Sequence, residues 1–327
     1  MLYNFRVAKH ERAALDEKMK DLNADFLRLM EEGGVSAIKA DPKFQMRAGQ
    51  LIRETIVDGF SMTDPTPIFT ERRDARLGDK IQVERLINTF RVVKYAPLSH
   101  PLVFTPRKAK YTMTTSSYEL PFGLDLIKVM TRQHTIGELA AMGSEALTRH
   151  YVNLTLTAVS AAAANGVNDM RGRPLRTQIA SPATDITKAA LDAQIRRMSQ
   201  YNTGLTIFAS QFALNPIFDF GATTEVSKEE LRTRGQIGTY RGAKLVAIQD
   251  DYNEYYGEFT KVGTKPLEEL VFLSGSVPGA TLLERDLSPL NWEELDVEKA
   301  QFRTGVRFDH GIFVHSPWRY GIVELNA

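Results

Sequence analysis

Cysteine is absent from the 327 residues of the chain. Structural disulfides, thiolate nucleophiles, iron–sulfur clusters and cysteine-ligated zinc are therefore excluded together. The sequence also has no apolar run of the roughly 20 residues that a membrane-spanning helix needs. Its first residues, MLYNFRVAKHERAALDEK, carry charges throughout and lack the apolar core of a signal peptide. These absences predict a cytosolic product.

An excess of charge of one sign is missing as well. The chain has 41 basic and 40 acidic side chains, which gives a net charge of +1. This balance argues against a protein that holds nucleic acid through a large basic field. The hydrophobic fraction of 43% and the charged fraction of 25% are those of an ordinary folded protein. The length suggests about two domains' worth of chain.

Motifs of catalysis and ligand binding are also lacking. The glycines of segment 234–238 have neither the Walker pattern nor the strand and helix that flank a dinucleotide loop. The acidic segment 250–254 departs from the EF-hand pattern after its first positions. No HExxH occurs, and His310 and His315 lie five apart on predicted strands, hence on opposite faces, as expected of satisfied polar residues. We predict no catalytic residue, no cofactor and no metal site.

The N-terminal part of the chain predicts two charged helices, over residues 9–32 and about 43–58. Each has only a narrow apolar stripe, which cannot form a core of its own. We therefore expect both helices to lie along another surface, such as a second copy of the chain. The stripes consist of Ala14, Met19, Leu22, Phe26, Leu29 and Met30 in the first helix and of Met46, Leu51, Ile52 and Ile56 in the second.

Residues 80–94 and 102–115 change to a strand pattern. Both are rich in Val, Ile, Thr, Phe and Tyr, and a proline-bearing turn over 95–101 separates them. They predict a long hairpin. Since an isolated two-stranded hairpin is marginal in water, it either rests on a neighbour or forms the edge of a larger sheet in its own domain. Its basic residues are Lys80, Arg85, Arg91, Lys94, Arg107, Lys108 and Lys110.

The rest of the chain predicts a mixed α+β fold. Its strongest helix covers 135–165, about 45 Å long at 1.5 Å per residue. A second helix near 186–200 precedes a strand over 205–209, and a hairpin turns at Gly242. The apolar stripe of the long helix is predicted at Leu139, Met142, Ala146, Tyr151, Leu154, Ala158 and Ala161. Further strands are predicted over 269–274, 279–285, 299–308, 311–316 and 319–325.

The order of these parts resembles the major capsid protein of tailed double-stranded DNA phages, which has the Hong Kong 97-like fold. A charged arm precedes a long cationic hairpin, one very long helix, a mixed domain and a strand-rich return. The resemblance covers nearly the whole chain, and the order of the segments carries it because each is weak alone. The segments are RRDARLGDKIQVERL (72–86), LPFGLDLIKVM (120–130), RGQIGTYRGAKLVAIQDDY (234–252), EELVFLSG (268–275) and FRTGVRFDHGIFVHSPWRYGIVEL (302–325).

The resemblance implies a division of the chain into four parts. These are an N-arm over 1–70, an extended E-loop over 71–117, a peripheral domain over 118–183 and 277–311 with a spine helix at 135–165, and an axial domain over 184–276 and 312–327. The arm and the E-loop would then bury their apolar sides against neighbouring subunits. The E-loop cations assigned to this subunit interface are Arg85, Arg91, Lys94, Arg107 and Lys108.

The implied function is assembly rather than catalysis. Copies of the chain would form hexamers and pentamers that close into an icosahedral shell around packaged double-stranded DNA, contacted non-specifically. The implied partners are a portal protein, a scaffolding protein and, in some relatives, a decoration protein, with no membrane. The protein would assemble in the host cytoplasm and end in the virion capsid. The alternatives are an encapsulin-like nanocompartment shell protein and an α+β enzyme or tail component.

Overall fold

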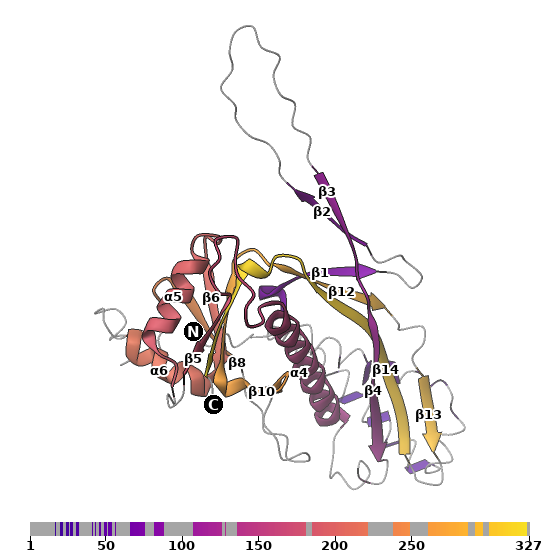
Figure 1. The fold of residues 1–327 in the computed structure, drawn as a ribbon. Coiled ribbons are helices and arrows are strands. Elements are labelled where there is room, and N and C mark those ends of the chain that lie inside the picture. Colours follow the sequence, from indigo (N-terminus) through magenta and orange to yellow (C-terminus); the bar gives the residue numbers. More distant parts are fainter. Residues whose placement is uncertain are drawn as a thin grey trace.

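A computed structural model gives the fold of the chain (Figure 1). Between residues 17 and 56 it describes single positions and short pairs, and it also describes Lys128. The continuous segments that it describes are 66–75, 82–87, 107–125, 136–180, 185–221, 238–248, 261–286, 292–296 and 301–325.

A six-stranded mixed sheet forms one half of the molecule, in the order β5-β15-β11-β6-β8-β7. The pairs β5–β15 and β6–β8 are parallel, and the other neighbours are antiparallel. Its strands were predicted to within a few residues, except β5. Their bounds are β5 Arg176–Ile179, β6 Leu205–Ser210, β7 Thr239–Tyr240, β8 Ala243–Ile248, β11 Leu270–Gly275 and β15 Tyr320–Leu325.

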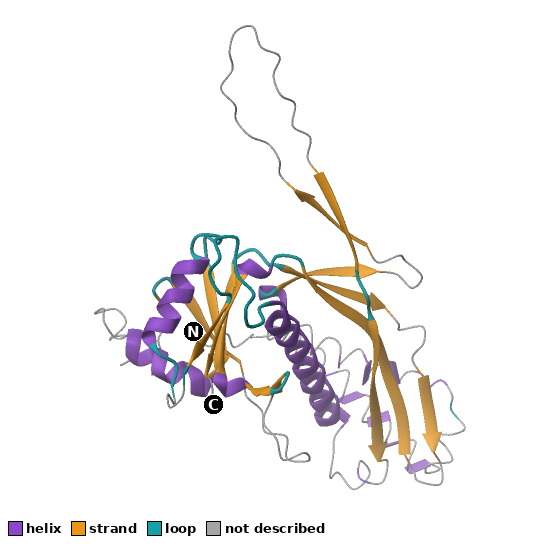
Figure 2. Ribbon diagram, in the orientation of Figure 1, coloured by secondary structure: helices purple, strands orange, loops and turns teal. Residues whose placement is uncertain are grey.

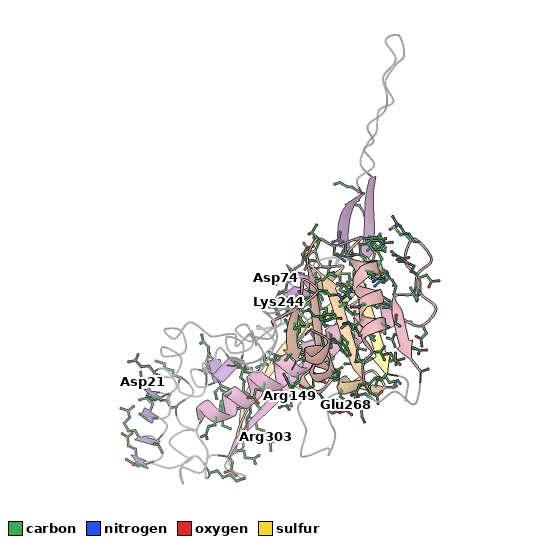
Figure 3. The ribbon with its side chains drawn as sticks, turned by 90° about the vertical axis from the view of Figure 1, so that its left-hand side faces the viewer. Asp21, Asp74, Arg149, Lys244, Glu268 and Arg303 are labelled. Atoms are coloured by element: carbon green, nitrogen blue, oxygen red, sulfur yellow. The ribbon has the colours of Figure 1, made fainter. Side chains whose placement is uncertain are left out.

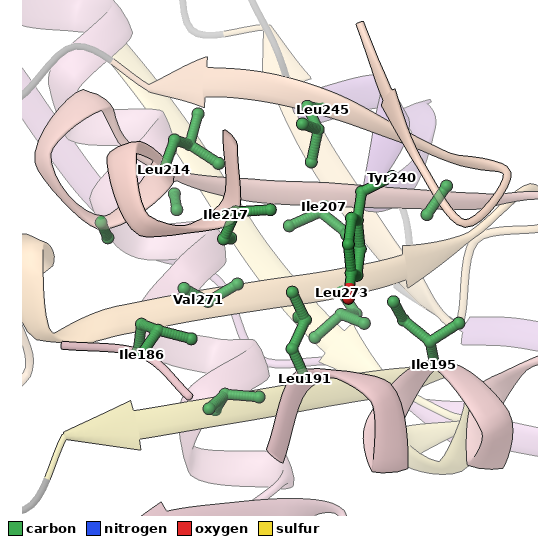
Figure 4. Close-up of a cluster of buried hydrophobic side chains, with 14 of the residues drawn as sticks. Ile186, Leu191, Ile195, Ile207, Leu214, Ile217, Tyr240, Leu245, Val271 and Leu273 are labelled. Atoms are coloured by element: carbon green, nitrogen blue, oxygen red, sulfur yellow. The ribbon is translucent and has the colours of Figure 1, made fainter. Parts of the chain in front are cut away.

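This sheet is buried on both faces. Successive side chains of a strand point to opposite faces, so Ile207 joins one apolar cluster and Phe208 the other. On the first face, α5 (Lys188–Met198) and α6 (Gln211–Gly221) cover the sheet. Figure 4 shows Leu191 and Ile195 of α5 packed over this face. The four apolar residues predicted for this helix are all buried, namely Ile186, Leu191, Ile195 and Met198.

A second sheet forms the other half of the molecule (Figure 2). It runs in the order β1-β12-β14-β13, and β4 also pairs with β14. Strand β1 lies parallel to β12, and the remaining pairs are antiparallel. Its bounds are β1 Thr70–Ala75, β4 Ser116–Asp125, β12 Ala280–Asp286, β13 Trp292–Asp296 and β14 Gln301–Val314.

The second sheet corrects the sequence prediction at three places. Residues 299–308 and 311–316 were expected as two strands, but β14 is one strand in which Gly311 pairs with Leu283. Strands β4 and β13 were not predicted. The sequence of β13, WEELD, is mostly acidic, and such residues are depleted in strands. Strand β13 therefore forms because its backbone pairs with β14, and not because its residues favour a strand.

Helix α4 (Ile136–Ala162) lies between the two sheets, as Figures 1 and 2 show. Its 27 residues give a length of about 40 Å, which confirms the long helix, although it ends three residues early. The predicted stripe is only partly right. Tyr151 is buried and Leu154 and Ala158 are half-buried, whereas Met142 (61% exposed), Ala146 and Ala161 are exposed; the side chain of Leu139 lies outside the described ones. The buried face instead consists of Ala140, Gly143, Ser144, Leu147, Tyr151, Val152, Thr155, Leu156 and Val159.

Two short antiparallel pairs complete the described strands. Strands β2 (Gln82–Ile87) and β3 (Arg107–Thr112) form the predicted hairpin, and β9 (Lys261–Val262) pairs with β10 (Lys265–Pro266). The 3-10 turns are η1 (Thr66–Ile68), η2 (Leu267–Glu269) and η4 (Pro317–Arg319). Within the described residues, no helix has the length and apolar character to cross a membrane. Figure 3 places Asp21 of the N-terminal segment at the opposite end of the molecule from the hairpin.

Candidate subunit interface

The β2–β3 hairpin projects away from both sheets (Figure 1). Its ladder runs from the pair Gln82 and Thr112 to the pair Ile87 and Arg107. The two arms pair in the predicted antiparallel sense, and residues 88–106 lie outside the described residues. The alternative of an edge hairpin in a larger sheet is wrong for the described strands, since β2 and β3 form a two-stranded sheet of their own.

Three of the five cations predicted at the interface lie in the paired strands β2 and β3. Arg85 is the backbone partner of Ala109, and Arg107 pairs with Ile87. Lys108 stands opposite Leu86 and is exposed. The other two, at positions 91 and 94, are outside the described residues. The intersubunit role of all five remains a prediction.

The base of the hairpin is fixed by apolar contacts to the second sheet. Met113, just after β3, is 5% exposed and packs with Leu283 of β12. Ala75 and Phe313 pack against this pair. The ring of Tyr111 lies 4.9 Å from that of Phe313, centroid to centroid. These contacts clamp the end of β3 between β1, β12 and β14.

Polar contacts and one glycine complete this base. Thr115 Oγ1 donates to Asp309 Oδ2 over 3.0 Å, and Arg285 Nη1 donates to the same oxygen over 3.1 Å. At Gly311, a Cβ would stand 2.2 Å from the carbonyl oxygen of Thr114. Only glycine therefore allows this approach of the chain to β14. These contacts fix the base of the hairpin on the second sheet, and the rest of the hairpin is directed outward.

The second N-terminal stripe has a partner within its own chain, which corrects the expectation that it needs another copy. Ile52 and Ile56 are fully buried. A Cβ on Gly143 of α4 would stand 3.0 Å from Ile56 Cδ1, and Arg53 Nη1 donates to Thr304 Oγ1 of β14 over 3.2 Å. Met46 of the same stripe is 65% exposed. The apolar stripe of the first helix, 9–32, lies outside the described residues.

A buried ion pair fastens the C-terminal end of α4 to the six-stranded sheet. Arg176 Nη1 lies 2.5 Å from Glu324 Oε2, and Lys265 Nζ lies 3.3 Å from the other carboxylate oxygen. The same guanidinium donates to the carbonyl oxygens of Ser160 and Ala163. The last carbonyls of a helix have no partner inside the helix, so Arg176 satisfies two of them while it neutralises Glu324.

Near the middle of α4, two histidines meet, a contact that the sequence analysis missed. His150 Nε2 of α4 lies 3.2 Å from His310 Nε2 of β14. Burial and the nearby His150 lower the pKa of His310 to about 4, and burial lowers the pKa of His150. The rings of Tyr118, Tyr151 and Phe308 surround the pair. The two histidines are 160 residues apart, so no spacing could have signalled their contact.

The described residues contain no group of three or more His, Cys, Asp or Glu side chains that could hold a metal ion. Asp169, in the turn after α4, is a buried carboxylate with several hydrogen bonds. Backbone N–H groups of Arg171 and Arg173 and the Arg173 side chain hydrogen-bond it and keep its pKa low, at about 2, despite burial. This cluster closes the turn after α4.

The fold matches solved phage capsid structures at low sequence identity. The mature capsid of bacteriophage PhiM1 aligns with a TM-score of 0.53 and 11% identity, over 81% of this chain and 87% of the other. The capsid of cyanophage P-SCSP1u aligns with a TM-score of 0.52 and 11% identity, over 79% and 86%. Gordonia phage Cozz gives 0.50 and 12%, over 80% and 86%. The chain therefore has the α+β fold shared with Hong Kong 97-type phage capsids.

The sequence comparisons supply the family. The search of curated proteins finds no match. A family model described as "SPbeta prophage-derived putative capsid protein YonB" matches residues 7–280, most of the chain. Together with the capsid fold, this match identifies a structural component of the virion. The chain belongs to the YonB family of prophage-derived capsid proteins and is a major capsid protein of the tailed-phage type.

Proposed function

We propose that copies of this chain form hexamers and pentamers that close into an icosahedral shell around packaged double-stranded DNA. The proposal extends the capsid family and the capsid fold to a specific assembly. The observation that carries it is the β2–β3 hairpin, which projects from the molecule while its base is clamped. Because a two-stranded hairpin is marginal in water, such a hairpin gains stability by lying on a neighbouring subunit.

The proposal divides the chain into functional parts. Strands β6, β7, β8, β11 and β15 with α5 and α6 would form the axial domain, and strands β4, β12, β13 and most of β14 with α4 would form the peripheral domain. Strand β5 pairs into the six-stranded sheet from the segment assigned to the peripheral domain, and β1 pairs into the second sheet from the junction of the N-arm and the E-loop. Helix α4 is in contact with both sheets and would transmit strain between them. The proposed bounds are 1–70 for the N-arm, 71–117 for the E-loop, 118–183 and 277–311 for the peripheral domain, and 184–276 and 312–327 for the axial domain.

The hairpin cations are proposed to act between subunits. An exposed ion pair contributes only about 0–1 kcal/mol, but a closed shell repeats each contact in every copy. Small energies per contact therefore suffice to decide between closed shells and free subunits. The cations that we assign to this contact are Arg85, Arg91, Lys94, Arg107 and Lys108.

The balance of charge supports a wall around DNA rather than a DNA-binding domain. With a net charge of +1, the chain has no large basic field to hold nucleic acid. DNA contacts would then be non-specific, with packaging driven through a portal protein at one vertex. We propose a scaffolding protein during assembly in the host cytoplasm and, on the finished virion, a decoration protein as further partners. The role is structural and not enzymatic.

Assembly is tested by co-expressing the chain with its scaffolding protein. Electron microscopy should show closed shells, and sedimentation should give particles far larger than a subunit. A well-folded monomer at high concentration in every condition tried would contradict the proposal. The contents of the particles separate the two shell classes, since packaged DNA supports a phage capsid and an enclosed enzyme supports a nanocompartment. The family match does not favour the nanocompartment.

The interface assignment is tested by charge reversal in the hairpin. The double variant Arg91→Glu and Lys94→Glu should keep the far-ultraviolet circular dichroism of the native chain but reduce the yield of shells. The matched control reverses Lys188 and Arg196, two exposed cations of α5, and should assemble normally. Normal shell yield and stability from the hairpin variant would show that these cations do not contribute to the contact between subunits.

A further inference from the structure

The contact of His150 with His310 joins α4 to the second sheet. His310, on β14, is 1% exposed, and His150 reaches it from the helix with 3.2 Å between the two Nε2 atoms. The Tyr118 ring of β4 stacks on His310 at 4.4 Å and meets His150 edge-on at 4.6 Å. Tyr151 of α4 lies 4.8 Å from the His310 ring. Two imidazoles therefore form the polar centre of an otherwise aromatic contact.

The distance between the two Nε2 atoms leaves room for one hydrogen atom, carried by one of them and accepted by the other. A neutral imidazole has one N–H donor and one acceptor nitrogen, so one Nε2 can donate to the other. If both rings are protonated, both Nε2 atoms carry N–H groups, and two positive charges face each other at hydrogen-bond distance. Nothing can then accept the shared hydrogen bond. The contact is consequently made by neutral rings and opposed by the doubly protonated pair.

The neighbouring carboxylates are already paired with cations, so they do not balance the positive charge that a second proton would add to the histidine pair. Glu284 of β12 is the backbone partner of His310, but its carboxylate lies 2.6 Å from Arg72 Nε of β1. That guanidinium stands 5.8 Å from the centroid of the Tyr151 ring and adds positive charge at the edge of the cluster. On β14, Asp309 accepts from Arg285 and from Thr115. On α4, Arg149 pairs with Glu145 at 3.9 Å on the exposed side.

We propose that the His150–His310 contact is an acid-sensitive latch that holds the N-terminal half of α4 on β14 while both rings are neutral and releases it when both are protonated. The C-terminal half of the helix is held separately. Val152, Leu156 and Val159 pack in the apolar cluster of the six-stranded sheet, and Arg176 binds the last carbonyls. The N-terminal half also packs against Ile56 at Gly143, so protonation should raise the population in which this half opens and leave the other half in place.

The sign and size of the effect follow from linkage. The native environment favours the neutral form of His310, with a pKa of about 4 against 6.5 for a free histidine. The contact is thus at full strength above pH 6.5 and weakens as the pH falls toward 4. If the released histidine titrates normally, the released population at pH 5 rises about thirtyfold over that at pH 7.5.

Hydrogen–deuterium exchange on the purified full-length chain tests the latch. Exchange at pH 5 and pH 7.5, corrected for the intrinsic rates, should accelerate about thirtyfold in residues 136–151. Residues 152–162 and α5 should change little. The same preparation at the same concentration is used at both pH values, and sedimentation at each pH shows whether the assembly state is the same. Uniform acceleration along α4, or none, would overturn the inference.

Variants of the chain and histidine spectra of the native chain test the same inference independently. His310→Gln removes the titrating ring and should abolish the acceleration, whereas His315→Gln, one residue beyond β14, should leave it unchanged. Because a buried replacement can impair folding, nitrogen-15 histidine spectra of the native chain give an independent readout. The His310 ring should stay neutral down to about pH 5. A His310 that takes up its proton near pH 6.5 would refute the latch.

Discussion

Replacing Gly311 by alanine should loosen the base of the hairpin. The added Cβ would stand 2.2 Å from the Thr114 carbonyl oxygen, 3.2 Å from its carbon and 3.3 Å from Thr115 Cα. Ordinary van der Waals contact begins near 3.4 Å, so the chain after β3 must move by about 1 Å. The opposing atoms are backbone, which cannot rotate out of the way. The movement would pull Thr115 away from Asp309 and Met113 away from Leu283.

The expected loss can be built from these contacts. Overpacking a well-packed site costs about 1–3 kcal/mol, and a lost hydrogen bond to the Asp309 carboxylate adds about 1–2 kcal/mol. Gly311 does not have a positive φ, so alanine itself meets no backbone strain there. We therefore expect Gly311→Ala to lower the free energy of unfolding by about 2–5 kcal/mol.

The matched control is Gly123→Ala on β4 in the same sheet, where no atom lies within 4 Å of an added Cβ. It should be neutral or stabilise the chain by up to about 1 kcal/mol, because alanine restricts the unfolded chain. Urea unfolding measures both free energies, and hydrogen exchange in residues 107–115 reports the hairpin base. If the two variants have equal stability and equal exchange, the close approach at Gly311 does not hold the hairpin.

Three other outcomes follow from the contacts described above. Arg176→Met should lower the free energy of unfolding by about 3 kcal/mol, because it leaves Glu324 buried without its closest cation. Tyr320→Phe should cost about 1–3 kcal/mol, since the buried hydroxyl donates to the Phe69 carbonyl oxygen and accepts a backbone N–H. Boiled mature particles should run as one band near 36.7 kDa, because an exposed lysine such as Lys108 lacks the desolvated surroundings that the formation of an isopeptide bond needs.

Each of these outcomes has its own control. The double variant Arg176→Met and Glu324→Leu should recover part of the lost stability, since no buried charge is left unpaired. Tyr240→Phe should cost less than Tyr320→Phe because its hydroxyl binds Asp192 in a less buried place. Equal losses would contradict the role of burial. A ladder of dimers, pentamers and hexamers that survives boiling would contradict the absence of cross-links.

Local periodicity in the sequence determined several elements of this protein. The spacing of Leu191, Ile195 and Met198 defines both the extent and the buried face of α5, because residues three and four apart share one side of a helix. The β-branched and aromatic residues around 82–87 and 205–210 mark β2 and β6 for a similar reason. The order of these elements along the chain also carried the resemblance to phage capsid proteins, which the family match bears out.

Only the tertiary structure decided which surfaces these elements bury. Met142 was expected in the buried stripe of α4 and is exposed, because the helix must present one side to two sheets that the sequence does not orient. Residues 309 and 310 were predicted as a break between two strands, whereas β14 is unbroken and Gly311 lets the Thr114 carbonyl approach it closely. The contact of His150 with His310 joins residues 160 positions apart. Such contacts arise when distant segments pack, and no local pattern of residue types encodes them.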